Sequence, residues 1–306
     1  MKKQIWAALV LTALLSGNEN LFAAGKIKIA ATTSTYASIA REITGDKAEI
    51  YSIASPHRDI HFVSPTPKDV MKVKNCDVFI HAGLDLEVWR GPLLDAVGRL
   101  DLMWPAGERQ IDLSRGIALL EIPASLSRAQ GDIHVHGNPH YWLDPVNGKG
   151  IAKNIADGLA GLYPQDADYF KKNLQAFDDK MDSKLKEWQD RLAPYKGRGV
   201  VVYHNSWPYF MQRFGLVTVG YLEFKPGIPP TPRHIEELIR TMKSKGVKIL
   251  IKEEFYENRT PKKVAKETGA VIAVLETETE EAKGDYFSLF EGNIHRLAGA
   301  LSEAEK

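Results

Sequence analysis

The chain has 306 residues, of which 44% are hydrophobic and 26% charged, and its formal net charge at pH 7 is +1. Residues 1–24 contain Lys2, Lys3 and Glu19, so without them the 40 basic and 39 acidic residues fall to 38 of each. This balance argues against nucleic acid or an anionic membrane surface as a partner. The length and composition are sufficient for two compact lobes, each with its own core.

The first 24 residues resemble a secretory signal peptide. Lys2 and Lys3 precede the apolar run Ile5–Leu15, which has the length of a signal core and is too short to span a bilayer, and Ala23–Ala24 marks the expected cleavage region. The single cysteine, Cys76, lies far inside the remaining chain, so neither a lipid-modified N-terminal cysteine nor an internal disulfide is expected. We therefore expect a free periplasmic protein that is not embedded in a membrane.

Short β-rich runs alternate with helical patterns through most of the chain. Such alternation is typical of parallel sheets covered by helices. The expected fold class is therefore α/β, with two similar lobes of parallel sheet and flanking helices. Strands are predicted at Lys26–Ala31, Ala48–Ile53, Asp77–His81, Gly199–Tyr203, Leu216–Tyr221, Lys248–Lys252 and Ala270–Leu275, and helices in the first half at Tyr36–Ile43 and Pro67–Val73.

One long amphipathic helix separates the two halves, and Pro194 ends it. Its apolar positions step by threes and fours, as one buried helix face requires. The pattern fits an ordinary surface helix, but the position between two β-α runs favours a rigid link at 164–194 between lobes at 25–163 and 195–306. The apolar positions are Phe170, Leu174, Phe177, Met181, Leu185, Trp188 and Leu192.

A weak internal repeat supports two similar lobes. Pro65–Val70 in the first half resembles Pro230–Ile235 in the second, and in each a threonine is followed by proline. Threonine can cap a helix whose first turn holds proline, so both segments predict a helix start.

Three histidines far apart in the sequence are the candidate ligands. His204 directly follows the apolar run Val200–Tyr203, and ligands collect at the carboxyl ends of strands in open α/β sheets. His61 and His140 lie in segments rich in Pro, Asn and Asp, which hold the backbone direction. Each alone reads as an incidental polar residue, but their joint placement indicates a nitrogen-rich metal site shared by two lobes.

Several separated motifs then resemble a known family. These are His61–Pro67, Gly83–Trp89, Asn138–Pro145, His204 after its strand, and Lys225–Pro232. In this order they resemble the solute-binding proteins of bacterial zinc and manganese ABC importers, the ZnuA/TroA-like family. The resemblance runs from about Lys26 to the end of the chain.

The resemblance implies two α/β lobes bridged by a rigid helix, with one metal ion between them. His61 and His140 would come from the first lobe and His204 from the second. In manganese-carrying members a carboxylate usually stands where His204 stands here, and three neutral imidazoles suit Zn²⁺ better than Mn²⁺. We therefore expect a monomer that carries Zn²⁺, with Mn²⁺ or iron as the alternative cargo, to the permease and ATPase of an ABC importer.

The fourth ligand is where the sequence departs from the family, which usually offers an aspartate after the last strand. Glu276 falls at the corresponding place and is the expected fourth ligand, with Glu278, Glu223 and water as alternatives. Glu278, Glu280 and the glutamate after it also read as a solvated acidic loop.

Other histidines and two carboxylates near the main motifs have possible secondary roles at the metal site. His134 and His136 resemble a much reduced form of the histidine-rich loop of zinc-binding relatives, and their alternation also suits an exposed strand or turn. His57 lies close enough to His61 in the sequence to invite the same idea of a weak metal contact, but a surface-loop role is expected. Asp59 and Asp144 can accept a hydrogen bond from the second ring nitrogen of a ligating histidine, which would fix its orientation.

The three histidines are also compatible with two other classes of function. Three histidines with an open position also describe a catalytic zinc centre, but the chain has no His-Glu-x-x-His motif, no Gly-x-Ser-x-Gly motif and no glutamate immediately beside a candidate ligand. We therefore expect a binding protein rather than a zinc-dependent hydrolase. A metal-dependent adhesin is the other alternative, because some relatives of this fold are adhesins.

Overall fold

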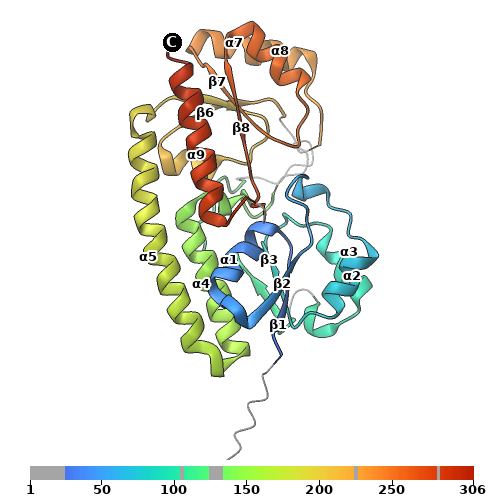
Figure 1. Ribbon diagram of the computed structural model, residues 1–306. Helices are drawn as coiled ribbons and strands as arrows, with labels where there is room; N and C mark the ends of the chain where they lie inside the picture. The colour runs from blue at the N-terminus through green and yellow to red at the C-terminus, as the bar shows by residue number, and fades with distance from the viewer. Residues whose placement is uncertain (1–24, 104–106, 124–133, 224–226, 281–282) are drawn as a thin grey trace, which may run out of the picture.

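The computed structural model describes residues 25–103, 107–123, 134–223, 227–280 and 283–306, so the predicted signal peptide lies outside the described residues. Two four-stranded parallel sheets lie one above the other along a long helix (Figure 1), which confirms the α/β fold class. The strands are β1 Ile27–Ala31, β2 Ala48–Ser52, β3 Val78–His81, β4 Gln110–Asp112, β5 Gly199–Val202, β6 Val217–Tyr221, β7 Ile249–Glu253 and β8 Val271–Leu275. The helices are α1 Ser34–Thr44, α2 Pro67–Lys74, α3 Arg90–Val97, α4 Pro145–Leu162, α5 Ala167–Leu192, α6 Pro208–Phe214, α7 Pro232–Lys245, α8 Arg259–Thr268 and α9 Tyr286–Glu303.

Both sheets have the same strand order. The first runs β2-β1-β3-β4 and the second β6-β5-β7-β8, with every neighbouring pair parallel. All seven predicted strands are present, each with its ends within a residue of the prediction. Strand β4 was not predicted, because a strand of three residues is too short to show an alternating pattern. The shared order makes the two lobes structural repeats.

The repeated Pro-Thr-Pro motif starts a helix in each lobe. The Thr66 hydroxyl accepts a hydrogen bond from the backbone of Asp69 at the start of α2, and the Asp69 carboxylate accepts one from the Thr66 backbone in return. Thr231 caps α7 in the same way, through the backbone N–H of His234. In both helices proline occupies the first turn, where its missing N–H costs nothing.

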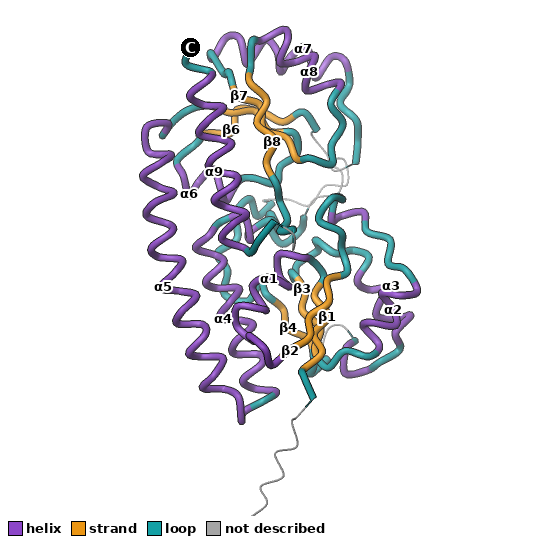
Figure 2. The backbone as a smooth tube through the Cα atoms, in the orientation of Figure 1, coloured by secondary structure: helices purple, strands orange, loops and turns teal. Residues whose placement is uncertain are grey.

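Helix α5 runs along both lobes (Figures 1 and 2) and packs against α1, α4 and α9. Five of its seven predicted apolar positions are fully buried, and Leu174 and Leu185 are partly buried. The same apolar cluster continues through both lobes. The linking helix is therefore an integral part of the core. The five buried positions are Phe170, Phe177, Met181, Trp188 and Leu192.

Buried hydrogen bonds also join the two lobes near their centre. The Trp142 indole N–H donates to the backbone oxygen of Thr277 at 2.8 Å, and the Tyr286 hydroxyl donates to the backbone oxygen of Trp142 at 2.6 Å. The Tyr209 hydroxyl donates to the backbone oxygen of Asn138 at 2.6 Å. Moving the lobes apart would break hydrogen bonds in a low-dielectric interior, where they are costly to lose.

Among the described helices, none combines the length and apolar character needed to cross a membrane.

Candidate metal centre

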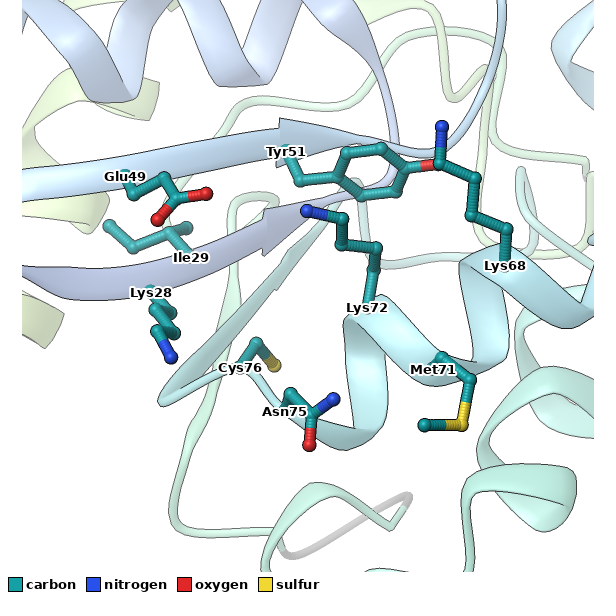
Figure 3. A pocket seen from close by; sticks show the side chains of 9 residues that line it. All are labelled: Lys28, Ile29, Glu49, Tyr51, Lys68, Met71, Lys72, Asn75 and Cys76. Atoms are coloured by element: carbon teal, nitrogen blue, oxygen red, sulfur yellow. The ribbon is translucent and has the colours of Figure 1, made fainter.

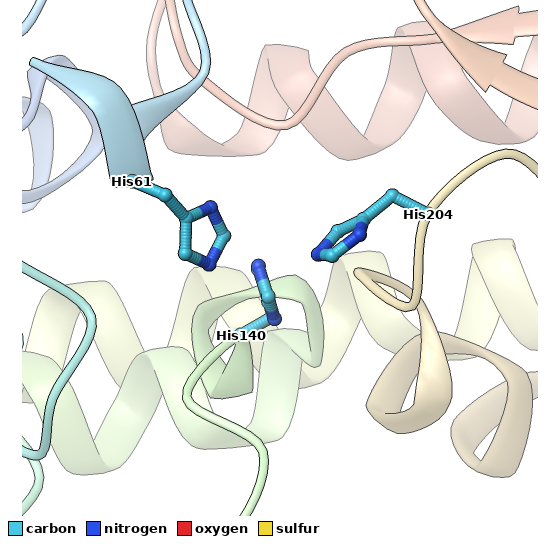
Figure 4. A group of neighbouring side chains, drawn as sticks. All are labelled: His61, His140 and His204. Carbon is cyan, nitrogen blue, oxygen red and sulfur yellow. The ribbon is translucent and has the colours of Figure 1, made fainter. Parts of the chain in front are cut away.

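The structure brings the three predicted histidines together between the lobes. His61 lies on a short 3-10 turn, Ile60–Phe62, after β2, and His140 immediately precedes another, Tyr141–Leu143. His204 follows β5 in the second lobe. One ring nitrogen from each lies within 4.8 Å of the others, and Figure 4 shows the rings facing a common point. The chamber they line has a volume of about 10 Å³, enough for one water molecule or ion.

The two histidines of the first lobe are held by the same local device. His61 Nδ1–H donates to Asp59 Oδ1 at 2.7 Å, and His140 Nδ1–H donates to Asn138 Oδ1 at 2.9 Å. In each case the backbone N–H of the histidine donates to the same oxygen, two residues upstream. Both Nε2 lone pairs are thereby left available for a metal ion.

One of the two predicted carboxylate supports is correct and the other is wrong. Asp59 orients His61 as expected, and its second oxygen accepts a hydrogen bond from the Tyr256 hydroxyl at 3.0 Å. Asp144 instead binds the Arg213 guanidinium through both oxygens, at 2.7 and 2.8 Å, and caps α4. Burial alone would raise the pKa of the Asp59 carboxyl, but the hydrogen bonds and charge of His61 bring it below its usual value.

His204 has no comparable support. Its ring is buried, and neither ring nitrogen has a hydrogen-bond partner among the described residues. Glu223 Oε1 lies 3.9 Å from its Nδ1, which is beyond hydrogen-bond distance. Buried polar atoms in native proteins nearly always have a partner. A metal ion held between the lobes would satisfy this imidazole.

The electrostatic environment keeps the buried histidines in their ligand form. Burial, together with the neighbouring imidazoles, lowers the pKa of His140 well below its usual value and that of His204 to about 3. Both are therefore neutral at physiological pH. A neutral imidazole is the form that binds a metal ion, so binding need not displace a proton from either ring.

The structure does not bring the expected fourth ligand, Glu276, to the histidines. Its carboxylate lies 3.4 Å from Arg296 Nη2 and 3.6 Å from Lys283 Nζ, and its backbone N–H donates to Asn293. It lines a neighbouring small chamber and not the one formed by the histidines.

Glu278 lines the histidine chamber instead. It is only 4% exposed, so the reading of a solvated acidic loop is wrong for this residue. Its Oε2 accepts hydrogen bonds from the Thr35 backbone at 3.1 Å and the Ser34 hydroxyl at 3.3 Å, whereas Oε1 has no partner among the described residues. Burial raises the pKa of this carboxyl to about 7.

His134 is closer to the centre than its sequence context indicated. Its Nε2 lies 3.3 Å from His61 Nε2, and its Nδ1 lies 2.9 Å from Asp85 Oδ1. His136, two residues further on, is exposed. Asp85 therefore holds His134 much as Asp59 holds His61, and the second motif of the sequence, Gly83–Trp89, supplies this support.

The comparisons with known proteins identify the family of the chain. The family model for the periplasmic zinc-uptake complex component A, ZnuA, matches residues 29–300. The chain belongs to the ZnuA family. This confirms the resemblance seen in the sequence, and it makes the chain a substrate-binding component of a metal ABC importer rather than an enzyme.

Relatives named for manganese and for zinc both match almost the whole chain. The manganese ABC transporter substrate-binding lipoprotein PsaA of Streptococcus pneumoniae is 28% identical over 97% of this chain and 96% of its own length. The zinc-binding protein AdcA of Streptococcus pyogenes is 25% identical over 97% of this chain and 61% of its own length. Membership in the ZnuA family therefore does not determine which metal the chain binds, and this question has to be addressed from the residues of the site.

Solved structures show the same fold. A crystal structure of ZnuA has a TM-score of 0.76 at 24% identity and covers 90% of this chain and 99% of its own. The Mn-bound periplasmic metal binding protein of Candidatus Liberibacter asiaticus has a TM-score of 0.75 at 22% identity, over 90% of this chain and 100% of its own. The same fold is found in a zinc-bound deletion mutant of ZnuA, with a TM-score of 0.76, and in this Mn-bound protein.

A larger groove in the first lobe does not belong to the metal centre. It has a volume of about 310 Å³, lies beside α2 and the first two strands, and shares no lining residue with the histidine chamber (Figure 3). Cys76 lines it, but burial raises the pKa of this thiol to about 11. A protonated, buried thiol is neither a reactive nucleophile nor a ready metal ligand.

Proposed function

We propose that the cargo of this protein is Zn²⁺. The observation that carries the proposal is the set of three convergent imidazoles, one of which, His204, is buried with no hydrogen-bond partner in the described part of the chain. Zn²⁺ favours four-coordinate sites built from nitrogen donors, whereas Mn²⁺ favours carboxylate, carbonyl and water oxygens. The neutral state of His140 and His204 supports this choice, because no proton opposes binding at either ring.

The three histidines supply three of the four zinc ligands in this proposal. Glu278 is the better placed carboxylate for the fourth position, because it lines the same chamber and its Oε1 is buried with no partner within the described ranges. His134 is the second candidate, since it lies beside His61. Glu276 is set aside, because Arg296 and Lys283 already neutralise it.

Capture and delivery follow from burial of the ion by both lobes. We expect the protein to work in the periplasm as a monomer, after removal of residues 1–24, and to dock on the permease and ATPase of an ABC importer. The shared core and the hydrogen bonds between the lobes oppose a large hinge motion. We infer that release depends on distortion of the site by the docked permease.

A competition experiment tests the cargo. The protein lacking residues 1–24, stripped of metal, is offered Zn²⁺ and Mn²⁺ together and its content is measured by elemental analysis. We expect one equivalent of zinc, held against excess manganese. H204E replaces an imidazole with an oxygen donor and should weaken zinc binding relative to manganese. Bound manganese in preference to zinc, or no stoichiometric metal, would contradict the proposal.

A matched pair of variants tests the fourth ligand. E278Q removes the charge of the carboxylate in the chamber, and E276Q makes the same change on a carboxylate outside it. We expect E278Q to lower zinc affinity by roughly tenfold or more, and E276Q to leave it unchanged. Equal zinc affinities of E278Q and E276Q would indicate that the fourth ligand is His134 or water and not Glu278. The zinc affinity of H134A would then distinguish between His134 and water.

Manganese is the second candidate cargo, and one observation of the structure favours it. If Glu278 binds the metal, the site gains an oxygen donor that Mn²⁺ accepts well. Zinc generally binds such a site more tightly than manganese, so the competition must also be run with zinc buffered to low free concentration.

A further inference from the structure

A second group of metal-ligating side chains lies outside the histidine chamber. His57 comes from the loop after β2, Glu254 directly follows β7, and Glu280 follows β8. One ligating atom of each lies within 4.8 Å of the others. His57 Nε2 is 2.8 Å from Glu280 Oε1, and its Nδ1 is 3.9 Å from Glu254 Oε2. One imidazole with two carboxylates is a donor set that suits a divalent cation such as Zn²⁺.

Three neighbouring cavities lie between this group and the metal centre, each sharing lining residues with the next. An open cleft of about 460 Å³ and a small chamber of about 10 Å³ meet at the group, and the small chamber in turn adjoins the histidine chamber. The open cleft and the small chamber share Pro56, His57 and Glu280. The small chamber and the histidine chamber share Phe255, Thr277 and Glu278.

We propose that His57, Glu254 and Glu280 form an outer site that binds a divalent cation on its way to the three histidines. The name outer site is used below for these three residues. Its role as a waypoint rests on the proposed function, whereas its ability to bind a cation does not. Glu254 and Glu280 raise the local concentration of cations at the mouth of the chamber, and a cation that moves inward exchanges these oxygens for imidazole nitrogens.

Lys283 sets how tightly the outer site can hold a cation. Its Nζ lies 3.1 Å from Glu280 Oε2 and 3.6 Å from Glu276 Oε1, so an ammonium group already neutralises part of the carboxylate charge. A bound metal ion has to compete with this ammonium. Because His57 and Glu254 are also exposed, water completes the coordination and the ion is held loosely enough to move on.

Binding at the outer site can be measured without the main site. In H61A/H134A/H140A/H204A, checked for folding by circular dichroism, calorimetric titration with Zn²⁺ should show about one weak equivalent. Adding H57A and E280Q should remove it, whereas adding H295A, on an exposed histidine of α9, should not. Adding K283M should tighten it severalfold, as loss of an exposed competing ion pair implies.

Two results would overturn the outer site. They are the absence of residual binding in the four-histidine variant, and residual binding that survives H57A and E280Q. If that variant does not fold, the same comparison is made on the wild-type chain loaded with one equivalent of zinc, where H57A and E280Q should abolish a second, weaker equivalent. Failure of the tight site appears separately, as a missing first equivalent in the wild-type protein.

The waypoint role has its own kinetic signature. In the wild-type background E254Q/E280Q should slow zinc association by roughly tenfold at low salt, and less at high salt, because carboxylate attraction is screened. The equilibrium affinity of the tight site should stay unchanged, so dissociation must slow by the same factor. An unchanged association rate, or a changed equilibrium affinity, would show that these residues do not act as a waypoint.

Discussion

The two lobes contribute histidine ligands whose rings are oriented by hydrogen bonds to different degrees. In the first lobe, Asp59 and Asn138 lie two residues before His61 and His140 and fix each ring through Nδ1. In the second lobe the residue two before His204 is Val202, whose side chain can accept no hydrogen bond, and the ring has no partner among the described residues. The first lobe therefore presents two oriented ligands, while the second supplies an imidazole whose polar atoms remain unsatisfied until a metal binds.

This difference suggests an order of events. Oriented imidazoles lose little freedom when they bind, so the first lobe can receive the ion. His204 then gains a partner that it otherwise lacks, and burial without one is costly. Part of the free energy of metal binding would thus stabilise the contact between the second lobe and the first.

The largest effects are expected at the ligands themselves. H140L and H204L should each lower zinc affinity by roughly 100- to 1000-fold, the share of one ligand in a four-ligand zinc site. Their effects on the metal-free protein should differ, as measured by urea unfolding. H140L loses a buried hydrogen bond and should cost about 1 kcal/mol or more, whereas H204L removes an unsatisfied group and should be neutral or stabilising. Equal destabilisation by both would remove the contrast between the lobes.

The sequence identified the fold and the three histidines because these depend on local patterns. Helix α5, the strands and the Thr66 and Thr231 caps each follow from residues a few positions apart. The supports of the ligands could also have been found, because Asp-x-His and Asn-x-His place an oxygen two residues before each ring in the first lobe. Asp144 was predicted as a support in place of Asn138, although it is Asn138 that precedes His140 by two residues.

The fourth ligand could not be found in this way. Glu276 and Glu278 both follow β8, and which one faces the chamber depends on how the chain turns after Leu275. The long-range partners decide this, since Asn293 and Arg296 of α9 hold Glu276 while Thr35 of α1 holds Glu278. No local pattern contains those contacts.

A second buried group of the second lobe extends the comparison to pH. Burial raises the pKa of Glu253 from 4.5 to about 8, and only one of its oxygens, which accepts the Trp207 indole N–H at 2.9 Å, has a partner among the described residues. The folded protein therefore holds a proton that the unfolded chain releases above pH 4.5. This contribution to the free energy of unfolding is present below pH 4.5 and is lost as the pH rises toward 8.

The measurement is urea unfolding of metal-free protein at pH 5 and pH 8. Between pH 5 and pH 8 we expect the free energy of unfolding of the wild-type protein to fall by roughly 2 to 4 kcal/mol because of Glu253. In E253Q this contribution is absent, so the fall should be smaller by the same amount. E254Q, on the exposed neighbour, is the control and should follow wild type. An E253Q profile parallel to that of wild type would mean that Glu253 is ionised in the folded protein.

Removing one support from the first lobe should have an intermediate effect. D59N keeps the shape of the side chain but removes the charge that accepts the His61 proton. Loss of such a support typically lowers metal affinity by about 10- to 100-fold, and N138A should fall within the same range for His140. D144N is the matched control, because Asp144 binds Arg213 and not a ligand. Wild-type zinc affinity in D59N would show that His61 needs no orientation.

The smallest effect is expected from Tyr256, the residue of the second lobe that touches a support of the first. Its hydroxyl donates to Asp59 at 3.0 Å, and its ring stacks on Tyr203 at 4.1 Å, next to His204. Y256F keeps the stacked ring and removes one hydrogen bond, so zinc affinity should fall about two- to tenfold, as competition with a chelator can measure. Y203F leaves the Tyr256 hydroxyl in place and is the control.

The double variant D59N/Y256F decides how Tyr256 acts. If its hydroxyl works only through the Asp59 carboxylate, the two changes act on one network and the double variant should bind zinc as D59N does. Additive losses would mean that the Tyr256 hydroxyl contributes to zinc affinity independently of the Asp59 carboxylate. The first result would make Tyr256 a link by which the second lobe helps to orient a ligand of the first, and the difference in preparation between the lobes would then depend on their contact.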